Sequence, residues 1–144
     1  MNYWIQNSDF SNPTGLGESE VVESAGQLLG ILADYDWAKE NAYEEKCLAK
    51  NNEDCCPAGI GIVSDDGHIL HICPKMTKGT AVVHLHHEVP TKILGFIKST
   101  KSQVTTFEDV PQPKLESAIK NFLASEYGAI LDAFKAYALS LIHI

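Results

Sequence analysis

The segment TAVVHLHHEVP concentrates three histidines and one glutamate within five positions. If this segment is a β-strand, His84, His86 and Glu88 point to one face of the sheet, because side chains alternate along a strand. Imidazole, thiolate and carboxylate groups are the ligands that zinc prefers in proteins, and His71 and Cys73 add two more donors. These five residues are therefore the main candidates for chemistry.

Two interpretations of this group are open. In the first, His71, His84 and His86 hold a metal ion, which would support a metal- or thiol-dependent enzyme that uses the histidine-rich sheet face. In the second, the histidines belong to a half-exposed sheet face and form local hydrogen bonds. A strand brings together only its alternate residues, and the sequence lacks a complete zinc-binding spacing, so the second interpretation is favoured. We expect no metal and no other cofactor.

Other catalytic arrangements have weaker signatures. Cys73 and His71 have the residue types of a nucleophile and its base, but one cysteine with several histidines is a common combination. Asp65 and Asp66 are better explained as turn residues, and the G-x-G of residues 59–61 is not followed by a helical pattern. The sequence therefore predicts no catalytic residues and a protein that is not an enzyme.

The charge of the chain is unevenly distributed. The formal net charge is −8, and residues 1–56 carry eleven acids and three lysines, whereas residues 57–144 carry eight acids and eight lysines. The sequence contains no arginine. Nucleic-acid binding depends on basic patches that neutralise phosphates, so this composition disfavours it. An acidic surface instead suits a basic protein partner, whose encounter it accelerates.

The candidate partner-binding surface lies in the segment ADYDWAKENAYEEK. Trp37 and Tyr43 have helical spacing, which usually packs aromatic residues inward, but exposed aromatic residues commonly anchor protein interfaces. A second candidate surface is the histidine-rich strand. The predicted partner-binding residues are Asp34, Asp36, Trp37, Glu40, Glu44, Glu45, His84, His86 and Glu88.

The length and the apolar content bound the class of protein. A chain of 144 residues has the size of one domain, which we assign to residues 1–144. Its apolar runs are shorter than the roughly 20 residues that cross a bilayer, and its first residues lack the features of a secretory signal. We expect a cytoplasmic monomer or homodimer that does not bind membranes. Its four cysteines are then expected to be reduced, with Cys47 and Cys73 buried.

Apolar spacing predicts helices on both sides of a run of strands. Residues 21–32 have one broad apolar face, and this helix is expected to begin near Glu18 or Ser19. Asp34 or Asp36 can cap a second helix that extends to residue 50. The C-terminal segment also has helical spacing, begins at a cap such as Asp109 or Gln112, and can be bent or divided at Gly128.

The middle of the chain has the alternation of a β-meander. GIGIV and HILHIC flank Asp66-Gly67, a strong hairpin-turn pair. TAVVHLHHE is expected to end at Pro90, followed by a strand KILGFIKS, a turn STKS and a strand QVTTFEDV. The N-terminal NYWIQ can add a short strand with Tyr3 and Ile5 on one side. The predicted fold class is α+β, a four- to five-stranded antiparallel meander with N- and C-terminal helices packed on one face.

Strand alternation also assigns the meander residues to two faces. A two- or four-residue hairpin would pair Ile62 with His71 and Val63 with Leu70. The face under the helices then holds Val63, Leu70, Ile72, Val83, Leu85, Leu94 and Phe96. The histidine face holds Ile60, Ile62, Ile69, His71, Cys73, Val82, His84, His86, Glu88, Ile93 and Ile97. A loop with an odd number of residues would flip one strand and change this assignment.

In its small size, acidic charge and α+β layout the chain resembles bacterial immunity proteins of contact-dependent and polymorphic toxin systems, and YDWAKE and CCPAGIGIV are its most distinctive segments. Those immunity proteins are small partners that bind and neutralise a cognate toxin domain. The resemblance implies a non-enzymatic protein that neutralises a basic toxin or effector domain, and it assigns no role to any single residue. We expect the acidic surface to bind such a domain.

Overall fold

The computed structural model describes residues 1–12, 19–50, 55–93 and 97–142. Its strands form an antiparallel sheet in the order β2-β1-β3-β4-β5-β6. The strands are β1 (Asn2–Gln6), β2 (Glu20–Val21), β3 (Gly59–Val63), β4 (Ile69–Lys75), β5 (Thr80–Ile93) and β6 (Ile97–Pro111). The helices are α1 (Ala25–Asp34), α2 (Trp37–Ala49), α3 (Gln112–Leu123) and α4 (Tyr127–Ile142).

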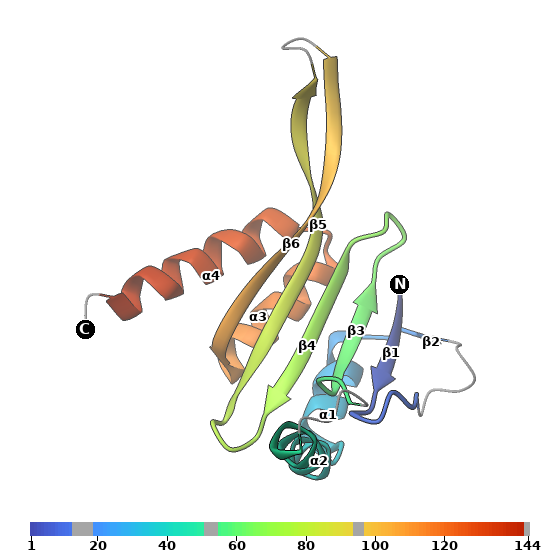
Figure 1. Ribbon diagram of the computed structural model, residues 1–144. Coiled ribbons are helices and arrows are strands. Elements are labelled where there is room, and N and C mark those ends of the chain that lie inside the picture. The colour runs from blue at the N-terminus through green and yellow to red at the C-terminus, as the bar shows by residue number, and fades with distance from the viewer. Residues whose placement is uncertain (13–18, 51–54, 94–96, 143–144) are drawn as a thin grey trace.

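The predicted α+β class is confirmed. Strands β3 to β6 follow one another as a meander, and β1 adds to it from the N-terminus by pairing with β3 (Figure 1). The expected N-terminal strand is also present, with Tyr3 and Ile5 buried and Trp4 on the other side. The sheet therefore has one strand more than the upper end of the predicted range, because Glu20–Val21 pairs with β1.

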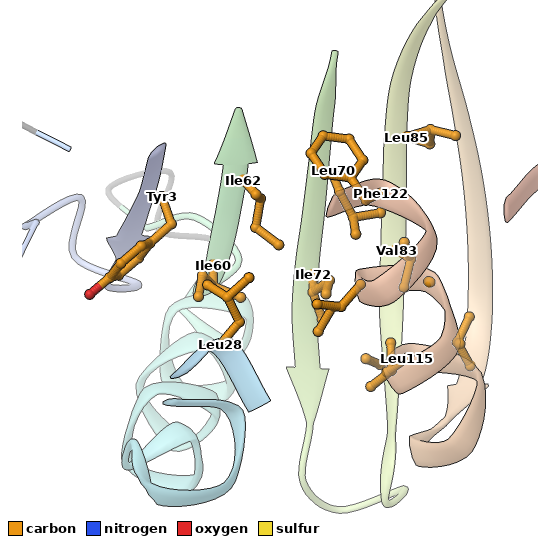
Figure 2. Packing of buried hydrophobic residues seen from close by; sticks show 14 of the residues in the cluster. Tyr3, Leu28, Ile60, Ile62, Leu70, Ile72, Val83, Leu85, Leu115 and Phe122 are labelled. Atoms are coloured by element: carbon orange, nitrogen blue, oxygen red, sulfur yellow. The ribbon is translucent and has the colours of Figure 1, made fainter. Parts of the chain in front are cut away.

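Helices α1 and α3 pack against one face of the sheet and contact each other (Figure 2). Burial of each aliphatic side chain in this layer contributes about 1.5–3 kcal/mol to stability. The layer thus accounts for the position of both helices. The buried sheet residues are Tyr3, Ile5, Ile60, Ile62, Leu70, Ile72, Val83 and Leu85, and the helices add Leu28, Leu115, Ile119 and Phe122.

The predicted start of the first helix was wrong. Helix α1 begins at Ala25, because the Ser24 side chain caps it by accepting a hydrogen bond from the Gln27 backbone N–H at 3.1 Å. Val21 lies instead in β2, where it pairs with Asn2 and is 67% exposed. The start of the apolar pattern therefore does not mark the start of this helix.

The second helix and the division of the C-terminal helices follow different local signals. Asp36 caps α2 as predicted and accepts from the Lys39 N–H at 3.1 Å. The C-terminal segment divides before Gly128: α3 ends at Leu123, and Ser125 adopts a left-handed conformation with φ 60°. The Glu126 N–H then donates to the Asn121 carbonyl at 2.8 Å, so this turn separates the two helices.

The register predicted for the first hairpin was wrong by one residue. Val63 pairs with Ile69 and Ile62 with Leu70, so the connection from Ser64 to His68 has an odd length. The Ser64 N–H donates to the His68 carbonyl at 2.9 Å and closes this loop. Strand β3 is consequently flipped relative to the prediction: Ile60 and Ile62 lie in the core, and Val63 lies on the histidine face.

Two predicted strand ends were also wrong. Pro90 lies inside β5, paired with Thr100, and the predicted turn STKS lies inside β6. Strand β4 pairs with β5 only as far as His86, so beyond this point β5 pairs with β6 alone among the described strands (Figure 1). A strand with an open edge tolerates proline, because half of its N–H groups have no partner strand. Leu94 and Phe96 lie outside the described residues, and the side chains of Ile93 and Ile97 are likewise not described.

Asp66 joins the first hairpin to the start of α4. Its carboxylate accepts hydrogen bonds from the Ser64 hydroxyl and, at 3.0 Å, from the Tyr127 hydroxyl, and it lies 2.9 Å from His68 Nδ1. The rings of His68 and Tyr127 stack with centroids 3.8 Å apart. The hydrogen bond from Ser64 and the contact with His68 hold the pKa of Asp66 well below its usual range.

We expect Asp66→Asn to lower the free energy of unfolding at neutral pH. A carboxyl whose pKa is depressed in the folded state stabilises the fold above the unfolded-state pKa of 3.8, and this contribution declines as the pH falls below that value. Urea denaturation at neutral and acidic pH should therefore show a difference in the free energy of unfolding between wild type and Asp66→Asn, and this difference should be smaller in acid. The matched control is Asp65→Asn, since the Asp65 side chain is 93% exposed. A difference in the free energy of unfolding that stays constant with pH would contradict the depressed pKa of Asp66.

Candidate functional site

The sheet face opposite α1 and α3 carries a row of paired residues on five adjacent strands. Trp4 pairs with Gly61, Gly61 with His71, His71 with His84, and His84 with Thr106. The rings of Trp4 and His71 stack with centroids 6.3 Å apart, and those of His71 and His84 with centroids 5.7 Å apart. The backbone register therefore brings two of the predicted histidines into direct contact.

Cys73 lies one step along β4 from His71 on the same face. Its Sγ is 3.7 Å from Nδ1 and 3.8 Å from Nε2 of the His71 ring. The candidate ligand atoms of His71, Cys73 and His84 all lie within 4.8 Å of one another. The structure thus joins Cys73, rather than His86, to His71 and His84 as a group of potential metal ligands.

Burial keeps this group uncharged. Burial, with a smaller contribution from His84 and His86, lowers the pKa of His71 to about 4. Burial also raises the pKa of the Cys73 thiol to about 12, and it lowers the pKa of His84. At neutral pH the two imidazoles are therefore neutral and the thiol is protonated, so Cys73 is not an activated nucleophile.

Gly59 makes room for two of these side chains. A Cβ at this position would lie 2.9 Å from His71 Nε2 and 3.0 Å from Cys73 Sγ, and only 2.6 Å from the Ile72 carbonyl oxygen. Any larger residue would thus displace both side chains or the β4 backbone. The requirement for glycine at this point of CCPAGIGIV follows from the close approach of β4.

His86 and Glu88 lie further along the same face. His86 is half-buried and pairs with Ile69 and Val104, while Glu88 is exposed. Both line a shallow cavity of about 280 Å³ together with Asp66 and His68. The remaining histidine of the strand, His87, points into the opposite face, is buried and lies 2.8 Å from the Thr105 hydroxyl.

Three of the predicted partner-binding residues on α2 point inward. Trp37 is only 1% exposed and donates from its indole N–H to the Leu32 carbonyl at 3.2 Å. Glu40 is buried and accepts from the Ser8 N–H at 3.3 Å. Glu44 accepts from the Ala58 N–H at 2.8 Å and forms an ion pair with Lys75 at 3.0 Å. These side chains attach α2 to the sheet and are not free to bind a partner.

The other predicted acids of this region are exposed. Asp34 ends α1 and Asp36 precedes α2, on either side of Tyr35. Glu45 is also exposed, but nine residues along α2 are two and a half helical turns, so it lies on the opposite side of the helix from Asp36. The structure therefore keeps Asp34 and Asp36 together and separates Glu45 from them.

Asp9 joins this surface, although sequence patterning did not single it out. Burial raises the pKa of Tyr35, and the charges of Glu40, Asp9 and Asp36 raise it further. These carboxylates therefore lie close to the Tyr35 hydroxyl, which donates to the Asn7 side chain. Asp9 comes near Tyr35 through the β1 end of the chain, a tertiary contact that leaves no periodic signal in the sequence.

We call Asp9, Asp34, Asp36 and the exposed Tyr43 the acidic strip. Asp9 and Tyr43 line a cavity of about 320 Å³, together with residues that include Lys39 and Lys46. Tyr43 is 40% exposed, so it is the accessible aromatic residue of α2 in the place predicted for Trp37. The strip thus combines three carboxylates, one aromatic ring and a concave surface.

The acids of the strip differ from many acids elsewhere in the molecule. Asp65, Asp66, Asp109 and Glu116 each lie in an ion pair, with the N-terminal amino group, His68, Lys78 and Lys120 respectively. Within the described residues, Asp9, Asp34 and Asp36 form no ion pair. The negative charge of the strip is therefore left available for a basic partner.

Comparisons of the chain with protein-family models, with curated proteins and with solved structures found no match. Among the described residues, the helices are too short or too polar to cross a membrane. Among the described residues, the four cysteines form no disulfide, and Cys47 and Cys73 are buried as predicted.

Proposed function

We propose that this chain is a non-enzymatic binding protein of the immunity type, which neutralises a cognate basic toxin or effector domain through the acidic strip. The observation that carries the proposal is the set of exposed carboxylates without internal ion pairs, Asp9, Asp34 and Asp36, of which Asp9 lines a concave surface. Carboxylates in such a setting attract a basic surface over a distance and accelerate its encounter.

Tyr43 supplies the contact that charge alone lacks. Charged groups at the rim of an interface mainly affect association rate and specificity, whereas partly buried aromatic side chains commonly carry much of the binding energy. Tyr43 is exposed and lines the same cavity as Asp9. A lysine or arginine side chain of the partner could thus contact the ring and a carboxylate together.

The alternative function, a metal- or thiol-dependent enzyme that uses the histidine face, has less support. The raised pKa of Cys73 is the opposite of what a nucleophilic cysteine requires. The cavity beside His86 and Glu88 has a volume of about 280 Å³, which is below the roughly 300–1,000 Å³ of the clefts in which most small ligands bind. The histidine face is therefore better considered as a binding surface than as an active site.

The proposal is tested with candidate basic toxin or effector domains, beginning with any that is encoded next to this chain's gene. We expect Asp9→Asn, Asp34→Asn, Asp36→Asn together to lower the association rate constant on the order of tenfold or more at low salt, because steering depends on net charge. Asparagine keeps the helix cap at position 36, so folding should be unaffected. Stopped-flow association at two ionic strengths measures the effect.

The matched control makes the same change of charge elsewhere. Glu108→Gln, Glu126→Gln, Asp132→Asn removes three exposed carboxylates from the C-terminal part of the chain. This control is expected to change the association rate by much less than the strip variant. Equal losses in both variants would show that total charge, rather than the acidic strip, governs binding.

A further inference from the structure

We propose that His71, Cys73 and His84 form a binding site for a single Zn²⁺ ion on the sheet face opposite the helices. This inference is independent of the proposed function, since the acidic strip lies after β1 and along the end of α1 and the start of α2, whereas these donors belong to β4 and β5. Two imidazoles and one thiolate are a donor set that zinc commonly takes.

The spacing of the donors fits a tetrahedral ion after a small adjustment. With Zn–S about 2.3 Å and Zn–N about 2.0 Å, neighbouring donors around tetrahedral zinc lie roughly 3.5 Å apart. The Cys73 Sγ lies 3.7 and 3.8 Å from the two ring nitrogens of His71, and all three donors lie within 4.8 Å of one another. Because Sγ is almost equally far from both ring nitrogens, the His71 ring must turn so that one nitrogen faces the ion.

A second residue orients one of the histidines. His84 Nδ1 lies 2.9 Å from the hydroxyl oxygen of Thr106 on the neighbouring strand. If Nδ1 donates to that hydroxyl, Nε2 keeps its lone pair for the metal. Ligating histidines almost always donate their other N–H in this way, which holds the ring in place.

The site is also partly prepared by its surroundings. Gly59 leaves open the space next to His71 Nε2 and Cys73 Sγ that a side chain would fill. A neutral imidazole is the form of histidine that binds a metal.

Binding requires the loss of one proton. Zinc binds cysteine as the thiolate, so the thiol proton of Cys73 is released to solvent when the ion binds. Three protein donors leave the fourth tetrahedral position to water or to an incoming ligand. The resulting site is open on the sheet face.

The experiment uses the full-length chain, stripped with a chelator and titrated with ZnCl₂ and with CoCl₂. We expect one equivalent of Zn²⁺, the release of about one proton per ion, and a near-ultraviolet thiolate-to-cobalt absorption band. Cys73→Ser, His71→Ala and His84→Ala should each weaken Zn²⁺ binding by at least about 100-fold, because loss of only an outer hydrogen-bond partner already costs roughly 10- to 100-fold.

Thr106→Val keeps the proposal testable if a ligand variant fails to fold. Thr106 is exposed and β-branched like valine, so its replacement should leave the sheet intact and weaken Zn²⁺ binding about tenfold. His86→Ala is the matched histidine control, and Cys56→Ser is the matched thiol control. Both variants should still bind one equivalent of Zn²⁺. Circular dichroism of each variant without metal verifies folding.

The absence of the cobalt absorption band, or a loss of Zn²⁺ in His86→Ala as large as that in His84→Ala, would overturn the proposed site. Association with the effector domain is measured on the same zinc-free protein. Failure of zinc binding with normal association would leave the acidic strip as the functional surface, whereas failure of association with normal zinc binding would contradict only the proposed function.

Discussion

Replacement of Trp37 with alanine is expected to lower the free energy of unfolding by about 3–5 kcal/mol. Trp37 is 1% exposed, its ring contacts Tyr35 with centroids 4.6 Å apart, and its indole N–H donates to the Leu32 carbonyl. The variant would leave a large cavity between α2 and the core and an unpaired carbonyl. Denaturation in guanidinium, followed by circular dichroism, measures the loss.

Tyr43→Ala is the matched aromatic control for this prediction. Tyr43 lies on the same helix but is 40% exposed, so its removal is expected to change the free energy of unfolding by about 0.5 kcal/mol or less. For partner binding we expect the opposite order of effects. Tyr43→Ala weakens binding, whereas Trp37→Ala weakens it only under conditions in which it unfolds the protein. A stable Trp37→Ala variant would show that the tryptophan is not a core residue.

Gly59→Ala is expected to lower the free energy of unfolding by about 1–3 kcal/mol, the usual cost of an added group in a closely packed region. The new Cβ would lie 2.6 Å from the Ile72 carbonyl oxygen, which belongs to the backbone of β4 and cannot rotate away. His71 and Cys73 would also be displaced. Equilibrium denaturation in the presence of a chelator measures this cost apart from any effect of metal.

Gly30→Ala is expected to have the opposite effect on the free energy of unfolding. Gly30 lies inside α1, and a Cβ there would meet no heavy atom within 4 Å, so alanine should stabilise the helix by up to about 1 kcal/mol. A loss of stability in both variants would indicate a general intolerance of substitution. Opposite signs at the two positions would support the close approach of β3 and β4.

Local features of the fold could be predicted because they depend on residues close in sequence. The cap at Asp36, the burial of Tyr3 and Ile5, and the common face of His84 and His86 follow from helix capping and strand alternation. Each of these features needs only one element. The α+β class was predictable for the same reason, since it is the order of such elements along the chain.

Features that depend on the length of a connection could not be predicted. Asp66 and Gly67 indicate a turn, but Val63 pairs with Ile69 instead of Leu70, so the observed connection is one residue shorter than in the predicted pairing. The hydrogen bond from the Ser64 N–H to the His68 carbonyl closes this loop. This one-residue difference reverses which side chains of β3 face the core. Pro90 likewise is compatible with a strand only because β4 has ended before it, which is a property of the whole sheet.

The candidate sites show the same division. The residue types of the metal-binding group were evident in the sequence, but the pairing of His71 with His84 and the approach of Cys73 required the register of β4 and β5. The inward direction of Glu40 and Glu44 depends on Ser8 and on the Ala58 N–H, which are distant in sequence. Asp9 enters the acidic strip by the same kind of contact.

Hydrogen–deuterium exchange of the chain, free and bound to the basic effector domain, tests binding through the acidic strip most directly. We expect slower exchange on binding in Asn7–Asp9 and in the segment from Asp34 to Tyr43, with the strands that carry His71 and His84 unchanged. Protection confined to β4 and β5, with unaltered exchange in the acidic strip, would contradict binding of the effector domain through the strip.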